Sequence, residues 1–133
     1  MGACYYIELK IKVRDEASAI KILQERIKRN TEQGITNYCL RNFAEKGIGT
    51  ETLDDLFKIF LAGDRSSYET ERQENNFIYI QNGFDASYGW EVEMMEMFEE
   101  ISSVLEDGSE FYIYPDSDYD LLVIENGRYK QVH

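Results

Sequence analysis

The sequence predicts a two-layer α+β domain in which helices pack on one face of a mixed, mainly antiparallel sheet. Three observations support this fold class: an alternating apolar stretch near the N-terminus, amphipathic helical segments in the middle, and three strand-like runs near the C-terminus. The expected order is β-α-α-α-β-α-β-β-β within a single domain, residues 1–133. This order is compatible with a ferredoxin-like sheet that carries a helical insertion, a likeness that fixes no function.

The first strand has the clearest pattern in the chain. Over residues 5–13 apolar side chains alternate with polar ones, which is typical of a strand with one buried face and, here, a basic outer face. Asp15 then stands where its side chain can cap a helix over 16–29, and residues 30–34 should form a turn. The apolar residues of this helix recur at helical spacing: Ile20, Leu23 and Ile27.

The middle of the chain predicts two more helices and a long loop. A short helix is expected over 36–46, and a better one over 53–61, which Gly63 would close. Residues 64–76 contain no aliphatic side chain, so we expect a loop there.

Residues 77–105 predict a buried strand followed by an acidic helix. The strand covers 77–80 and should end at Asn82-Gly83, and the helix should run over 90–105 with Asp85 or Ser87 as its cap. Its apolar stripe contains Met94, Phe98, Ile101 and Leu105. Three carboxylates at i, i+3 and i+7 should share one exposed stripe, so reversing the charge of the last two should leave the fold intact: Glu93, Glu96 and Glu100.

A three-strand meander should complete the sheet, with strands over 110–114, 119–125 and 128–132. Asn126-Gly127 is a strong signal for a two-residue hairpin because a type I′ turn needs two residues with positive φ. The strand over 119–125 is apolar on both faces near its end, which predicts an internal strand covered on both sides, and the last strand should lie at an edge.

The net charge of −12 is unevenly distributed. Residues 1–75 contain 13 acidic and 12 basic residues, whereas residues 76–133 contain 13 acidic and only 2 basic ones. A strongly negative surface repels nucleic acid and favours a partner with a basic surface.

The residues needed for catalysis or cofactor binding are scarce. The only histidine is His133, and the two cysteines, Cys4 and Cys39, are far apart and give no zinc pattern. No window approaches the ~20 apolar residues of a membrane span. We therefore expect a cytoplasmic protein with no cofactor, no nucleic-acid partner and no membrane contact.

Two local motifs resemble ligand sites but are incomplete. Asp116, Asp118 and Asp120 alternate like the start of a calcium loop, yet the required glycine and final glutamate are absent. The Gly47-Ile48-Gly49-Thr50 stretch precedes a helix but lacks the lysine and the preceding strand of a phosphate-binding loop. We expect no metal and no phosphate at either motif.

The sequence thus favours a small acidic, non-enzymatic module that binds another protein, for instance an inhibitor or immunity-type protein that imitates phosphate charge. The expected contact residues are acidic or aromatic: Trp90, Glu93, Glu96, Glu100, Asp116 and Asp118. One alternative is a homodimer or larger homo-oligomer in which the basic face of the first strand meets the acidic meander. Another is a small hydrolase or transferase that uses carboxylates.

Overall fold

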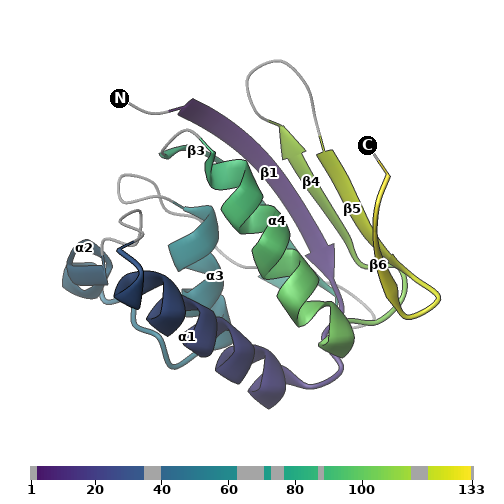
Figure 1. The fold of residues 1–133 in the computed structure, drawn as a ribbon, viewed down its shortest axis with the longest axis horizontal. Helices are drawn as coiled ribbons and strands as arrows, with labels where there is room; N and C mark the ends of the chain where they lie inside the picture. Colours follow the sequence, from purple (N-terminus) through teal and green to yellow (C-terminus); the bar gives the residue numbers. More distant parts are fainter. Residues whose placement is uncertain are drawn as a thin grey trace.

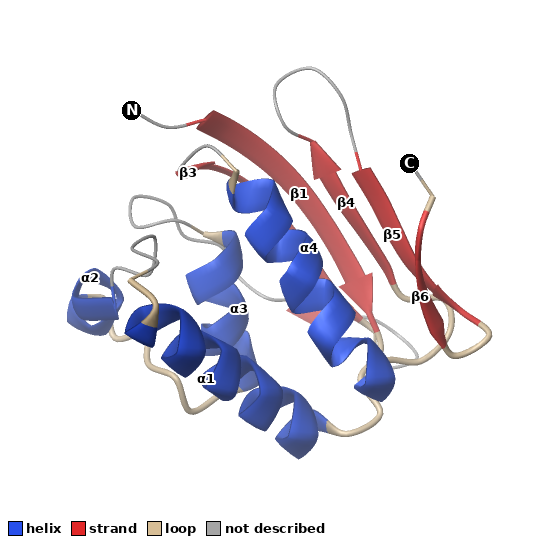
Figure 2. Cartoon of the chain, in the orientation of Figure 1, coloured by secondary structure: helices blue, strands red, loops and turns tan. Residues whose placement is uncertain are grey.

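The protein folds into two layers, with the helices on one face of a single sheet (Figures 1 and 2). The computed structural model describes residues 3–34, 40–62, 71–72, 77–86, 89–114 and 120–132. The predicted α+β class is confirmed, and all described residues of the buried core belong to one apolar cluster between the layers.

The sheet has the strand order β2-β3-β1-β4-β5-β6. Its strands are β1 (Ala3–Ile11), β2 (Glu71–Arg72), β3 (Ile78–Ala86), β4 (Glu110–Tyr114), β5 (Asp120–Glu125) and β6 (Arg128–Gln131). Every pair of neighbouring strands in the described sheet is antiparallel. The sheet therefore lacks the parallel pairing that the predicted mixed sheet would contain. The order β2-β3-β1-β4, with helices after β1 and β3, is the ferredoxin-like arrangement, and β5 and β6 extend it.

In the described part of the chain, helices α1, α3 and α4 cover one face of the sheet (Figure 2). The α-helices of the described residues are α1 (Glu16–Glu32), α2 (Leu40–Glu45), α3 (Leu53–Leu61) and α4 (Trp90–Ile101). In Figure 1, α1 and α4 run side by side in front of the sheet, with α3 beside α1. Asp15 caps α1 as predicted, accepting a hydrogen bond from the Ser18 amide at 3.1 Å.

The alternation predicted for the first strand is confirmed in β1. Its inward residues are fully or almost fully buried, namely Tyr5, Ile7, Leu9 and Ile11. On the helical side Phe98 of α4 is also fully buried, with its ring centroid 5.6 Å from that of Phe111 on β4. The inward face of β1 and the apolar stripe of α4 therefore form one core, as the matching periodicities of strand and helix require.

The second long strand is longer than predicted. Asn82-Gly83 does not end it; β3 continues to Ala86 and pairs with β1 along its whole length. The Asn82 side chain donates to the Leu61 carbonyl at 2.9 Å, so this polar residue serves the end of α3 rather than a turn. The predicted loop over 64–76 also contains the two-residue β2.

Two helix boundaries differ from the prediction. Helix α1 continues to Glu32, so only Gln33 and Gly34 of the expected turn over 30–34 form a turn. Helix α4 begins after Gly89, with φ of 89°, instead of after a capping Asp85, and it ends at Ile101 in a 3₁₀ turn over Ser102–Val104. The other predicted cap, Ser87, lies outside the described residues. The chain then leaves the helix because Leu105 forms a bridge with Val13.

The C-terminal hairpin is confirmed, since Asn126 and Gly127 have φ of 55° and 73°. Strand β5 is internal, and β6 lies at the sheet edge, as predicted. However, β5 is covered on one face only: Leu122 and Ile124 are buried, whereas Leu121 and Val123 are partly exposed.

Candidate functional site

A cleft of about 510 Å³ lies between α1 and α4. Its walls come from the second half of α1 and the first three turns of α4, which Figure 1 shows side by side. The lining residues are Arg26, Arg29, Asn30, Gln33, Gly89, Trp90, Val92, Glu93, Glu96 and Glu100.

Arg26 is at the centre of this site and is almost completely buried. Its guanidinium meets the Glu93 carboxylate through two parallel hydrogen bonds, from Nε to Oε1 at 2.7 Å and from Nη2 to Oε2 at 2.9 Å. Nη2 also donates to Glu96 Oε1 at 2.9 Å, and Nη1 donates to Glu100. One cation on α1 therefore holds three carboxylates on α4.

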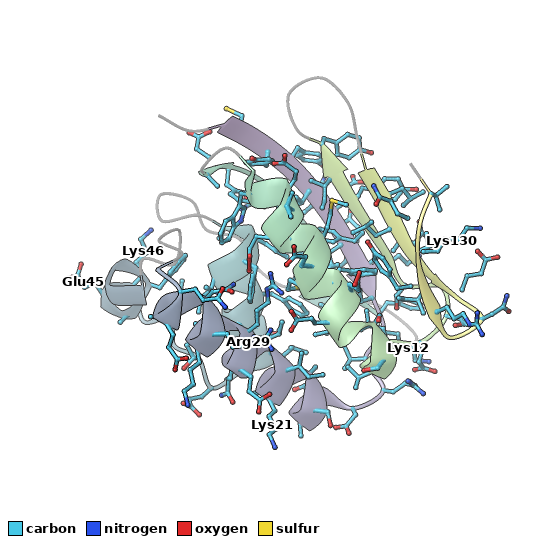
Figure 3. All side chains as sticks on the ribbon, viewed as in Figure 1. Lys12, Lys21, Arg29, Glu45, Lys46 and Lys130 are labelled. Carbon is cyan, nitrogen blue, oxygen red and sulfur yellow. The ribbon has the colours of Figure 1, made fainter. Side chains whose placement is uncertain are left out.

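Two further α1 side chains extend the network. Arg29, labelled in Figure 3, donates from Nη2 to the Glu100 carboxylate at 2.8 Å and 3.0 Å. Asn30 is buried and donates to Glu93 Oε1. The network contains three carboxylates and two guanidiniums, so it carries one excess negative charge.

The pKa of Arg26 reflects these contacts. Burial disfavours the charged guanidinium, but the hydrogen bonds to Glu93 and Glu96 and the charges of Glu93 and Glu100 outweigh it. The pKa of Arg26 is therefore held above its usual range, and the guanidinium stays charged inside the site.

The α1 sequence explains why these polar groups face inward. The buried residues of α1 follow helical spacing and include two polar members: Ala19, Leu23, Arg26, Ile27 and Asn30. Their stripe faces α4, so a cation inside it needs carboxylates on the opposing helix. Sequence reasoning missed Arg26, Arg29 and Asn30, although the spacing of 19, 23, 26, 27 and 30 was available as a signal.

The first turn of α4 is fixed by Tyr5 of β1. The Tyr5 hydroxyl accepts a hydrogen bond from the Trp90 amide at 3.2 Å and donates to Glu91 Oε2 at 2.7 Å. Burial and the Glu91 carboxylate raise the pKa of Tyr5 to about 12. Gly89 provides no side-chain cap, so the phenol of Tyr5 satisfies one of the free amides at this helix end.

Trp90 anchors the same end of the cleft. Its indole is buried, and Nε1 donates to the Phe60 carbonyl of α3 at 2.9 Å. Next to it Val92 is 52% exposed. The cleft thus combines a rigid aromatic, an accessible apolar residue and a charged network.

Four of the predicted contact residues meet in this cleft: Trp90, Glu93, Glu96 and Glu100. The prediction that the three glutamates form one exposed stripe is wrong, because Glu93 is only 9% exposed and the side chains of Glu96 and Glu100 are 56% and 30% exposed. Arg26 and Arg29 of the same chain draw them toward α1. The two remaining predicted residues, Asp116 and Asp118, lie outside the described residues.

The chemistry available in the cleft is charge pairing and hydrogen bonding. Its described lining supplies carboxylates, guanidiniums and amides, but no imidazole, thiol or hydroxyl. Within the described ranges no three His, Cys, Asp or Glu side chains converge to hold a metal ion. At the glycine-rich stretch before α3, the Gly49 amide donates to Asp55 Oδ2 at 3.1 Å.

No helix in the part of the chain that the structure describes is both long and apolar enough to span a bilayer. Comparison of the chain with protein-family models, with curated proteins and with solved structures finds no match.

Proposed function

We propose that this protein is a non-enzymatic binding module whose partner is another protein with a basic surface, held at the cleft between α1 and α4. The observation that carries the proposal is that Trp90, Glu93, Glu96 and Glu100 line one cleft of about 510 Å³. These residues come from one helix, and their positions are fixed by contacts to α1, α3 and β1.

The charge of the site favours a cationic partner. Arg26 and Arg29 neutralise two of the three carboxylates, and Glu96 is the most exposed of the three. A lysine or arginine of the partner that reaches Glu96 would balance the remaining negative charge. Such charges at the rim of an interface mainly steer the encounter and raise the association rate.

The apolar part of the site supports a protein partner over a simple cation. Val92 offers exposed aliphatic surface beside Trp90 at the cleft. Interfaces between proteins typically combine such an apolar contact with a polar, charged rim. An inhibitor or immunity-type protein that covers the nucleic-acid site of an enzyme would use its surface in this way.

The test is capture of the partner from lysate of the native host with three baits: wild type, Glu96→Lys and Glu99→Lys. Both substitutions change the net charge by the same amount, but Glu99 is exposed and does not line the cleft. We expect a protein that binds wild type and Glu99→Lys and is lost from Glu96→Lys. A partner retained equally by all three baits would contradict the proposed contact surface.

A further inference from the structure

The face of the sheet opposite the helices carries a second surface, rich in aromatic side chains. Tyr6, Tyr112 and Tyr114 project from β1 and β4 and are partly exposed. The Tyr112 and Tyr114 rings stack with centroids 6.1 Å apart, and the Tyr6 ring lies 5.6 Å from that of Tyr114. On β5, Leu121 and Val123 continue this surface toward Val132, which is 54% exposed.

The register of the sheet orders the charges on this face. The midline of the six strands that the structure describes runs between β1 and β4. Across it, Lys10 lies opposite Glu110, Glu8 opposite Tyr112, and Tyr6 opposite Tyr114. The row through Lys10 and Glu110 ends in Glu71 on β2 and Lys130 on β6, so its two ends also carry opposite charges.

We propose that this open face binds a second copy of the same chain, in a symmetric dimer whose two-fold axis follows the midline between β1 and β4. Sheets that pack face to face keep their strands nearly aligned. The two-fold rotation then places Lys10 of each copy over Glu110 of the other, twice in one interface. It also places Glu8 over the Tyr112 hydroxyl and Tyr6 over Tyr114.

The individual contacts suit this arrangement. Lys10 makes no ion pair with any described residue; its Nζ lies 5.2 Å from the centroid of the Phe77 ring, at the surface. Burial, followed by the charge of Glu110 and its hydrogen bond with Tyr112, raises the pKa of the Tyr112 phenol.

A second copy fits this face better than the basic partner proposed for the cleft. Lys10 and Lys130 would repel a basic surface, whereas Glu8, Glu71 and Glu110 would repel nucleic acid. Only a surface that places negative groups over these lysines and positive or neutral groups over these glutamates can pair with both. A second copy related by the two-fold axis provides that arrangement. The dimer leaves the helical face, and with it the cleft, open to a partner.

The test is the molar mass in solution, measured by light scattering during gel filtration from micromolar to submillimolar concentration. We expect wild type to have the mass of two chains. Lys10→Glu and Glu110→Lys should each have the mass of one chain, since each places like charges together twice. An equimolar mixture of the two variants should regain the double mass, because both contacts between positions 10 and 110 then join a glutamate to a lysine.

The control pair is Lys21→Glu on α1 (Figure 3) and Glu99→Lys on α4, both exposed on helices, and both variants should keep the double mass. Circular dichroism melting shows whether each variant is folded. If the charge variants do not fold, Tyr112→Ser should weaken dimerisation at least tenfold without changing the net charge. A single-chain mass for wild type, or a double mass for Lys10→Glu and Glu110→Lys separately, would overturn the proposal.

Discussion

Arg26 on α1 and Glu93 on α4 form a bidentate ion pair, with N–O distances of 2.7 Å and 2.9 Å, and both side chains are buried. The pair joins two helices that are far apart in the sequence and fixes the wall of the cleft. The pair also shows that the acidic second half of the chain is not wholly exposed negative charge. Part of that charge is matched by cations that the first half places beside it.

The first prediction concerns the removal of Arg26. Arg26→Met leaves Glu93 buried without its cation, which should lower the free energy of unfolding by roughly 3–5 kcal/mol. Adding Glu93→Met should restore much of the loss, since an apolar pair of similar volume needs no charge compensation. Denaturant unfolding of the two single variants and the double variant measures the coupling. Additive single losses would show that the pair makes no special contribution.

The second prediction concerns Glu100. The sequence suggested that reversing the charges of Glu96 and Glu100 would leave the fold intact or slightly stabilise it, but Glu100 contacts both Arg26 and Arg29. Glu100→Lys turns two ion pairs into like-charge contacts and should cost about 1–2 kcal/mol, discounted for partial exposure. Glu99→Lys, on the exposed side of the same helix, should stay within ~0.5 kcal/mol of wild type. Equal melting temperatures for the two variants would contradict the observed pairing.

The third prediction is a pH dependence that originates at Tyr5. Its pKa is raised from 10.0 to about 12 by burial and by Glu91. Above pH 10 the unfolded chain releases this proton while the folded chain keeps it, so stability falls as the pH rises from 10 to 12. Below pH 10 both states hold the proton, and the contribution is fully present.

Tyr5→Phe isolates this effect from other tyrosines whose pKa is also raised, such as Tyr79 and Tyr112. The variant should be less stable by about 1 kcal/mol at neutral pH because the Trp90 amide and Glu91 lose their partner. The difference from wild type should shrink between pH 10 and 12. A constant difference across that range would argue against the raised pKa.

The fourth prediction concerns the core. Phe98 is fully buried, 5.6 Å from Phe111 and 6.2 Å from Tyr129 between ring centroids. Phe98→Ala should cost roughly 3–5 kcal/mol through lost burial and the cavity that remains. An unchanged denaturant midpoint would mean that α4 presents a different face to the sheet.

Much of the fold was predictable because its signals are local. The alternation in β1, the cap at Asp15 and the positive φ of Asn126 and Gly127 each depend on neighbours in the sequence. The start of α4 and the role of Asn82 were predicted wrongly because both depend on distant partners. The Tyr5 hydroxyl accepts a hydrogen bond from the Trp90 amide at the start of α4, and the Asn82 side chain donates one to the Leu61 carbonyl at the end of α3.

Only the α4 side of the candidate site was predictable from the sequence. The glutamates of α4 were recognised by their spacing, but their apparent exposure came from treating the helix as isolated. Whether Glu93 faces solvent depends on Arg26, 67 residues earlier in the chain. Spacing within one helix contains no information on that partner, so half of the network became visible only in the folded chain.

The most direct test of the proposed function is the association rate of the captured partner with wild type, Glu96→Lys and Glu99→Lys, at low and high salt. The two variants match in net charge, so any difference between them arises at the cleft. We predict that Glu96→Lys slows association much more than Glu99→Lys, and that salt slows wild type toward the rate of Glu96→Lys. Equal association rates for wild type and Glu96→Lys at low salt would contradict the acidic cleft as the contact surface.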